Sequence, residues 1–426
     1  MWIAASNLFL ILGCSGSQAD TAAEEQYTAE ELAIIATLTP MPTLPADPTN
    51  VVADNEDAAH FGQWLFFDTR LSDNGEVSCA TCHDPKQGFS DGLSLSEGLS
   101  ITGRHAPSIF DTAYNRWMFW DGRCDSHWCQ ALGPIEDAGE MGMSRLQVVH
   151  VLADDADLSA SYDAVFGALP DLSDTDRFPE AGRPMEDVTD PLHVAWASMS
   201  EDDQFTVNTI FSNVGKAIAA YERQILTGPA PMDDYIAALV ADGETAASGL
   251  ISEEAQRGLK MFAGEGNCHF CHAGASYTNN EFHNIGLGPR DWLRPDDTGR
   301  FDGITALLSN PFNSIGVFSD DTTSAEIALN HLSETAEQLG QFKVPSLRNV
   351  ASHPPYMHGG HFETLTDVVS FYNELEEEPD WGHREDLMVP LELDEDGIAD
   401  VVAFLEALSG DGPAESLFFA PDSPIP

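Results

Sequence analysis

The hydrophobic and polar positions of this chain are typical of helices joined by loops. Apolar residues recur at helical spacing over 210–225, until the sequence around Pro229 stops the pattern. Shorter stretches of the same kind predict helices over 57–68, after Ser252 and over 398–408. We therefore expect a mostly α fold.

Two segments lack this periodicity. Residues 26–55 are rich in Thr, Pro and Asp and predict a tether followed by irregular structure, whereas residues 106–143 combine aromatic residues with Gly and Pro, which suits an active-site wall. The chain has 426 residues, 42% of them hydrophobic, so it is globular and long enough for two or three domains. The expected division is a signal segment 1–20, a tether 21–50, an N-terminal domain 51–240 that includes an inter-domain helix, a C-terminal domain 241–412 and a tail 413–426.

Two five-residue stretches have the sequence Cys-x-x-Cys-His, which attaches a c-type haem. Their residues are Cys79, Cys82 and His83 in the first motif, and Cys268, Cys271 and His272 in the second. The thiols bond the vinyl groups of the haem and the imidazole ligates its iron. Structural zinc and a pair of disulfides are the alternatives, and zinc fits less well because neither cysteine pair has a second pair at the usual distance. A thioredoxin-like site fits poorly as well, since the motif occurs twice and no βαβ pattern surrounds it. The two motifs predict two covalently bound haem c groups.

The first residues resemble a bacterial lipoprotein signal. A short apolar run leads to Cys14, which small polar residues follow. Cleavage would leave a lipidated Cys14, although the basic start of a usual signal is missing; an ordinary secretory signal is the alternative. Both alternatives predict an exported protein, in the periplasm or cell envelope, and the first one predicts a lipid anchor.

Cys124 and Cys129 remain. In an oxidising compartment an even remainder favours a disulfide. Their spacing is awkward on a regular helix, so the bond needs a turn or a distorted helix start. Two free thiols, or a small metal site that includes His127, are the alternatives.

The net charge of −53 is extreme. It argues against nucleic acid and anionic lipid surfaces as partners, which the field of the protein would repel. Life in high salt, or docking to a basic electron donor, would account for such a surface.

Beyond the haem motifs, the chain resembles the bacterial di-haem cytochrome c peroxidases and their MauG-like relatives over about residues 58–410. The matching stretches are 64–72, 88–92, 104–107, 119–123, 130–134, 140–142, 342–350, 355–360 and 371–373. The resemblance implies a mostly α fold of two cytochrome c-like domains packed against each other. It also implies that the first haem reacts with peroxide and that the second relays electrons to it.

The resemblance assigns roles to three further residues. Cleavage of hydrogen peroxide on iron needs an open coordination position, a group that moves a proton and a group that orients the peroxide. The match to Gln-Ala-Leu-Gly-Pro makes Gln130 the orienting group, and the match to Glu-Met-Gly makes Glu140 the acid/base. Trp120 corresponds to the tryptophan between the two haems. The alternatives are a solvated carboxylate for Glu140 and simple core packing for Trp120.

Two positions depart from the family pattern. Where some peroxidases carry a loop histidine that blocks the first iron at rest, this chain has Glu97, and residues 84–103 contain no histidine. We therefore expect an open first haem. His105 replaces an asparagine that the family associates with calcium, and imidazole is a poor calcium ligand. Calcium is then a candidate only through backbone carbonyls near His353 and Pro355, and His105 is itself an alternative ligand of the first iron.

The distal ligand of the second iron has two candidates. A gap-free alignment from Pro355 places Tyr372 where the peroxidases carry methionine and MauG carries tyrosine. Met357 is the alternative. Methionine raises the potential of a haem and an anionic oxygen ligand lowers it, so this ligand decides the chemistry.

The sequence thus predicts an oxidoreductase that reduces hydrogen peroxide with electrons from a small cytochrome c or a cupredoxin. The alternative is a MauG-like oxidase that uses peroxide to modify an aromatic residue of a partner protein. Pure electron transfer would need neither Gln130 nor Glu140. A homodimer is compatible with the sequence.

Overall fold

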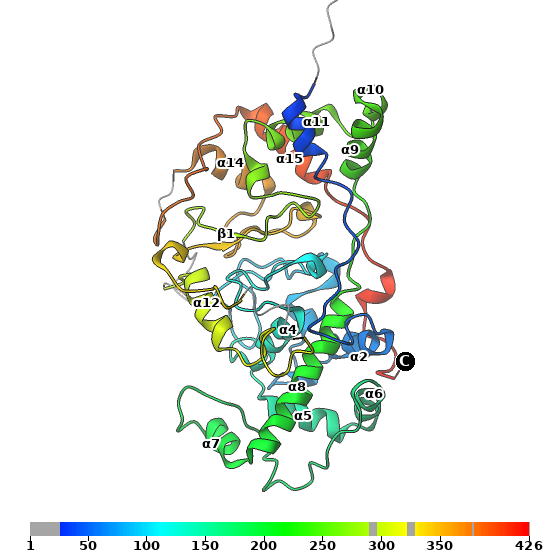
Figure 1. The fold of residues 1–426 in the computed structure, drawn as a ribbon, viewed down its shortest axis with the longest axis vertical. Helices are drawn as coiled ribbons and strands as arrows, with labels where there is room; N and C mark the ends of the chain where they lie inside the picture. Colours follow the sequence, from blue (N-terminus) through cyan, green and yellow to red (C-terminus); the bar gives the residue numbers. More distant parts are fainter. Residues whose placement is uncertain (1–25, 289–295, 322–328, 377–378, 426) are drawn as a thin grey trace, which may run out of the picture.

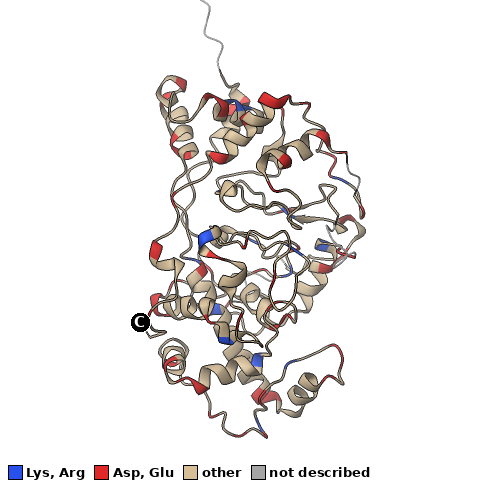
Figure 2. Cartoon of the chain, turned by 180° about the vertical axis from the view of Figure 1, so that it is seen from behind, with Lys and Arg blue, Asp and Glu red and all other residues tan. Residues whose placement is uncertain are grey.

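The computed structural model describes residues 26–288, 296–321, 329–376 and 379–425. The proposed signal segment and Cys14 lie outside these residues. Within the described residues, no helix is both long and apolar enough to cross a membrane. The fold is mostly α, as the sequence predicts, and Figure 1 shows its helices gathered in two halves along the long axis. Asp and Glu are spread over both halves in Figure 2, and Lys and Arg are few.

The first half is built around a long helix, α8, that packs on α2 and α4 (Figure 1). Close approach explains two glycines: a Cβ at Gly62 of α2 would overlap the carbonyl oxygen of Ala217, and one at Gly215 would crowd the backbone of Trp128. Around them lies the larger hydrophobic core. The helices of this half are α2 (Glu56–Phe67), α3 (Cys79–Cys82), α4 (His127–Glu136), α5 (Arg145–Asp154), α6 (Ala156–Phe166), α7 (Pro191–Ser198) and α8 (Glu201–Glu222).

The second half has its own core, in which α11 packs on α15. Gly258 of α11 permits this contact, because a Cβ there would overlap the carbonyl oxygen of Asp400. A two-stranded antiparallel sheet pairs Phe282 with Lys343 and His283 with Phe342. The elements are α9 (Pro231–Asp242), α10 (Glu244–Ala247), α11 (Glu253–Ala263), β1 (Phe282–His283), β2 (Phe342–Lys343), α14 (Leu365–Glu374) and α15 (Glu395–Glu406). Between the two strands, α12 (Arg300–Ser309) lies outside this core and packs Leu307 against Trp117.

The two ends of the described chain cross over. Residues 29–35, expected in the tether, form α1 (Ala29–Ile35), which packs on α11 in the second half. The tail returns to the first half, where the Tyr221 hydroxyl donates to the Leu417 carbonyl at 2.5 Å and the Ser161 hydroxyl donates to that of Pro424 at 2.8 Å. Each end therefore completes the core of the opposite half.

The predicted helices agree with the structure except at their limits. The helix expected over 210–225 is the second part of α8, which begins at Glu201 because Ser200 caps it and three acidic residues fill its first turn. After α8 the chain changes core at once: α9 belongs to the second core through Met232, Tyr235 and Ile236. The change of core thus comes earlier than the expected boundary at 240.

We expect Gly62→Ala to lower the free energy of unfolding by about 3 kcal/mol, because the added methyl group forces α2 away from α8. Denaturant unfolding of the haem-loaded protein measures the loss. Gly412→Ala is the matched control, since a Cβ there meets only the Phe418 ring at 3.7 Å. Equal stability of the two variants would contradict the tight helix crossing.

Candidate haem and peroxide site

Both Cys-x-x-Cys-His motifs line one cavity of about 680 Å³. Its wall includes Cys82 and His83 from the first motif, and Cys268, Cys271 and His272 from the second. All four motif cysteines are free. The sequence separation of the motifs is large, yet the fold brings them to one connected space.

The two motif histidines are oriented in the same way. The Nδ1–H of His83 donates to the Phe89 carbonyl at 3.1 Å, and that of His272 donates to the Tyr277 carbonyl at 2.9 Å. Phe89 and Tyr277 both have positive φ, of 56° and 51°, which aims these carbonyls back at the rings. Burial lowers the pKa of His83 and brings that of His272 to about 4, so both rings are neutral. A neutral ring that donates through Nδ1 presents the Nε2 lone pair, as an iron ligand must. The residues present therefore fit two covalently attached haem groups.

Gln130 and Glu140 both line this cavity. Gln130 lies on α4, whose first turn is capped by the Ser126 hydroxyl. Glu140 follows α4 on a loop whose backbone is fixed: Leu99 N–H donates to the Glu140 carbonyl at 2.9 Å, and Ser100 N–H donates to the Gly139 carbonyl at 2.9 Å. The charge of Glu140 contributes to raising the pKa of the Cys79 and Cys82 thiols, so it lies beside the first motif. Glu140 thus lies beside the first haem motif, and Gln130 lines the same cavity.

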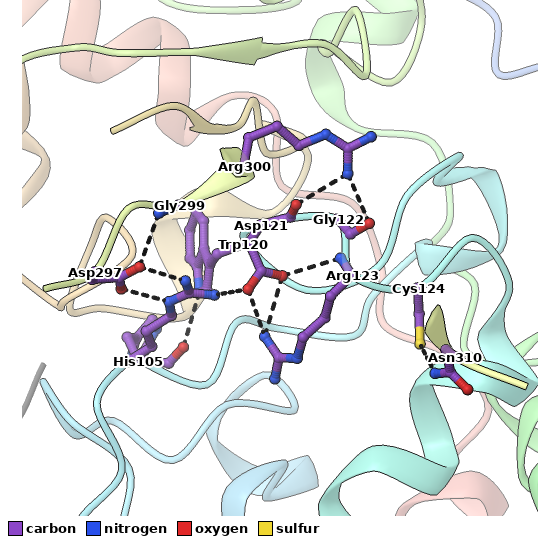
Figure 3. A network of polar contacts seen from close by, with 11 residues as sticks. His105, Trp120, Asp121, Gly122, Arg123, Cys124, Asp297, Gly299, Arg300 and Asn310 are labelled. Carbon is purple, nitrogen blue, oxygen red and sulfur yellow. Dashed lines mark hydrogen bonds and ion pairs between the residues drawn. The ribbon is translucent and has the colours of Figure 1, made fainter. Parts of the chain in front are cut away.

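Trp120 also lines the cavity, and backbone groups from distant segments hold it. Its indole N–H donates to the His105 carbonyl at 2.9 Å, and its own carbonyl accepts from Lys343 N–H at 2.7 Å. The ring meets the His358 ring edge to face, with centroids 6.4 Å apart. Figure 3 shows the indole beside the polar network described next.

A buried ionic network fixes the loop that carries Trp120 (Figure 3). The guanidinium of Arg104 donates twice to Asp297, at 2.9 and 2.7 Å, and once to Asp121, at 2.7 Å. All three side chains are less than a tenth exposed. Arg123 and Arg104 together hold the pKa of the Asp121 carboxyl well below its usual range, against the effect of burial. Arg300 completes the network by donating to the carbonyls of Asp121 and Gly122.

The network includes residues that sequence reasoning missed, Asp297 and Arg300. No local pattern marks them, because their partners lie more than a hundred residues away. Two further cavity residues were missed as well: burial raises the pKa of Glu222 to about 8 and lowers that of Lys343 to about 8. The sequence could have indicated Glu222, because this carboxylate follows Ile218 by four residues and therefore falls on the apolar face of its helix.

Tyr372 and Met357 both line the cavity. Tyr372 lies on α14, and burial raises the pKa of its phenol. Its phenol is also close enough to Cys268 and Cys271 for charge on their sulfur atoms to act on it, which places it beside the second motif. Met357 sits in a turn with φ of 74° and packs with Tyr372 in one apolar cluster.

His105, Glu97 and Pro355 lie at different depths. Glu97 is exposed, whereas His105 and Pro355 line the cavity. The ring of His105 is committed through Nδ1 to the Leu93 carbonyl at 2.7 Å, and burial lowers its pKa. His105 lies close to His353, and its charge adds to the effect of burial in lowering the pKa of His353. Over the described ranges, no group of three or more His, Cys, Asp or Glu side chains could hold a metal ion.

Cys124 and Cys129 form a disulfide, with Cα atoms 5.7 Å apart. The bond is possible because Cys124 precedes the N-cap residue Ser126, so only Cys129 is on α4. Both sulfur atoms accept from the Asn310 amide, at 3.8 and 3.4 Å, and Figure 3 shows this amide beside Cys124. Of the alternatives that the sequence left open, the structure has the disulfide. It connects the segment of Trp120 to the residue before Gln130.

Comparisons with known proteins identify relatives of this chain. Residues 56–240 match the family model described as di-haem cytochrome c peroxidase. The cytochrome-c peroxidase IdrP2 of Denitromonas iodatirespirans is 30% identical over 371 residues, which are 84% of this chain and 83% of that protein. The methylamine utilization protein MauG of Methylorubrum extorquens is 29% identical over 413 residues, 96% of this chain and 93% of that protein.

Two solved structures resemble the fold. A MauG-like protein associated with microbial copper homeostasis has a TM-score of 0.59 and 26% identity, over 89% of this chain and 97% of that chain. The di-haem peroxidase BthA of Burkholderia thailandensis has a TM-score of 0.58 and 21% identity, over 89% and 92%, which bears on the fold alone.

Proposed function

The chain belongs to the di-haem cytochrome c peroxidase family, and within this family we propose that it reduces hydrogen peroxide at the first haem with electrons relayed from the second. It is an oxidoreductase that uses peroxide and carries two haem c groups. The observation that carries the proposal is the presence of Gln130 and Glu140 on the wall of the cavity that His83 also lines. Pure electron transfer gives no reason for these two side chains.

Each residue has a separate part in the reaction. The bound haem irons supply the open coordination position and pass on the electrons that the reduction of peroxide consumes. The Gln130 amide orients the peroxide by a hydrogen bond. The Glu140 carboxylate takes the proton from one peroxide oxygen and delivers it to the other, which leaves as water. With two further protons and two electrons, each molecule of peroxide yields two molecules of water.

Trp120 is the proposed relay between the haem groups. Its hydrogen bonds to His105 and Lys343 fix the indole in the cavity, so the donor and acceptor distances stay constant during turnover. The electrons come from a small cytochrome c or a cupredoxin. A basic donor suits a chain with a net charge of −53, because opposite charges speed the encounter.

A MauG-like oxidation of a partner protein is the second candidate function. The observation that favours it is Tyr372, whose phenol lies beside the second motif. A tyrosinate ligand would lower the potential of the second haem and let it hold an oxidising equivalent, which the methionine Met357 would oppose. The acceptor would be a tryptophan or tyrosine of the partner.

The remaining proposals concern location and minor components. We place the protein in the periplasm or cell envelope, held by a lipid on Cys14, on the strength of its signal-like start. A homodimer is compatible with this arrangement. Calcium is proposed only through backbone carbonyls near His353 and Pro355, since the His105 side chain is unsuited to it.

Glu140→Gln should leave both haems bound and slow peroxide cleavage by about two to four orders of magnitude, the usual contribution of a positioned acid/base. Stopped-flow mixing with hydrogen peroxide measures the rate. The control is Glu97→Gln, because Glu97 is exposed. Glu136→Gln would be unsuitable, since Glu136 forms an ion pair with Arg145. A near-wild-type rate for Glu140→Gln would make Glu140 an ordinary loop carboxylate.

The fully oxidised protein should contain one high-spin haem. Residues 84–103 hold no histidine that could block the first iron, and the corresponding residue, Glu97, is exposed. Electron paramagnetic resonance of the resting protein is the measurement. Two low-spin centres would show that another side chain, His105 foremost, occupies the first iron.

Tyr372→Phe should change the spectrum of the second haem and raise its potential, because an anionic oxygen ligand is lost. Met357→Leu should do neither. A redox titration followed by optical spectroscopy compares the two variants. A spectral shift in the methionine variant alone would assign Met357 as the ligand and favour the ordinary peroxidase over the protein-modifying oxidase.

A further inference from the structure

A second tryptophan lies close to Trp120. Trp117 is three residues earlier in the chain, is only 5% exposed, and lines the same cavity. Three residues of chain span at most about 11 Å between Cα atoms, which places both indoles on one part of the cavity wall. Trp117 is therefore the candidate by which oxidising equivalents would leave Trp120.

Two guanidinium groups stand over the indole of Trp117. The Cζ of Arg116 is 5.2 Å from the ring centroid, and that of Arg300 is 4.7 Å from it. Arg300 also lies 4.0 Å over the Phe282 ring. Arg116 is exposed, whereas Arg300 is 3% exposed.

Two neighbouring cations are unexpected in a chain that is so strongly acidic. With 18 Lys and Arg against 71 Asp and Glu, cations are scarce, yet two of them share one ring. Within the described ranges, neither arginine forms an ion pair, and the charge of Arg116 contributes to lowering the pKa of Arg300. Burial is the main cause of that lowering, to about 10, and the nearby carboxylates of Asp121 and Glu281 oppose it, so Arg300 stays charged at neutral pH.

We propose that Arg116 and Arg300 insulate Trp120 electrostatically by making Trp117 difficult to oxidise. The step they oppose is the transfer of one electron from the Trp117 indole to the oxidised Trp120 indole, with no bond or proton moved. That step would create a positive charge about 5 Å from two others, and at this distance the repulsion at a partly buried site exceeds thermal energy several-fold. Oxidising equivalents derived from peroxide then stay on Trp120 and the haems. The inference rests on the proposed relay role of Trp120.

The cation in the network beside Trp120 is paired with carboxylates. The Arg104 guanidinium forms ion pairs with both Asp121 and Asp297. The indole N–H of Trp120 points at a carbonyl oxygen, whose partial negative charge stabilises a cation. The two tryptophans therefore differ in how easily each loses an electron, although they are close in sequence.

The test uses the haem-loaded protein, one equivalent of hydrogen peroxide and no electron donor. Four variants are compared. Arg116→Gln removes the charge and Arg116→Lys is the control that keeps it. Trp117→Phe and the double variant Arg116→Gln/Trp117→Phe remove the indole. Optical spectroscopy follows the lifetime of the oxidised state. Peptide mass spectrometry measures the oxygen added to Trp117, which does not depend on turnover.

Arg116→Gln should shorten the lifetime by about three- to tenfold, a modest effect because solvent screens an exposed charge, and should increase the oxidation of Trp117. Arg116→Lys should behave as wild type. The double variant should have the same lifetime as Trp117→Phe, because in both variants the indole that would give its electron to oxidised Trp120 is missing. Arg300→Gln, with Arg300→Lys as control, should shorten the lifetime further because this charge is buried.

The inference is overturned if Arg116→Gln and Arg300→Gln leave both the lifetime and the oxidation of Trp117 unchanged. It is also overturned if Arg116→Gln shortens the lifetime equally in the Trp117→Phe background, which would indicate a structural effect. If the wild-type protein did not react with hydrogen peroxide, the proposed function would be contradicted. The inference would then fail as well, because it rests on that function.

Discussion

The buried guanidinium of Arg104 connects the two halves of the molecule at the point where the chemistry is proposed. It belongs to the first half, as does Asp121, whereas Asp297 is in a segment whose Gly299 pairs with Gln341, just before β2 of the second half. Removing one member of such a buried ionic network costs about 3–5 kcal/mol, because the remaining charges stay desolvated without a partner. The same network holds the turn of Trp120, which links the packing of the two halves to the position of the proposed relay.

The crossing of the chain ends works toward the same result. α1 belongs to the core of the second half, and Leu417 of the tail belongs to the core of the first. Neither half can complete its core without a segment attached to the other, so separating them costs apolar burial as well as ion pairs. The cavity that both haem motifs line is therefore built by two parts that stabilise each other.

Local signals explain what the sequence predicts well. A Cys-x-x-Cys-His motif carries its own geometry, since the backbone carbonyl that orients His83 comes from Phe89, six residues later, and that for His272 comes from Tyr277. The periodic helices and the mostly α fold were predictable for the same reason. The pairing of Arg104 with Asp297 was not predictable, because it spans 193 residues. The helix α1 was missed in its Thr- and Pro-rich segment, although Thr28 and Glu31 form a capping box at its start. The disulfide between Cys124 and Cys129 was predictable only in part. The spacing of the two residues allowed it, but the helix start at Ser126 decided it.

The scarcity of cations gives the remaining ones particular weight. Several of the 18 basic residues are inside the protein: Lys216, Arg223 and Arg348 are buried in ion pairs with carboxylates, as Arg104 is. Figure 2 accordingly shows acidic residues over the helices of both halves and few basic ones. These four cations are thus matched by carboxylates, while the chain as a whole has 71 acidic against 18 basic residues. Repulsion between surface carboxylates opposes the compact state and weakens as salt shortens the Debye length, whereas the buried pairs are screened much less. Salt therefore has opposite effects on two properties: it stabilises the fold, and it slows the encounter with any basic electron donor.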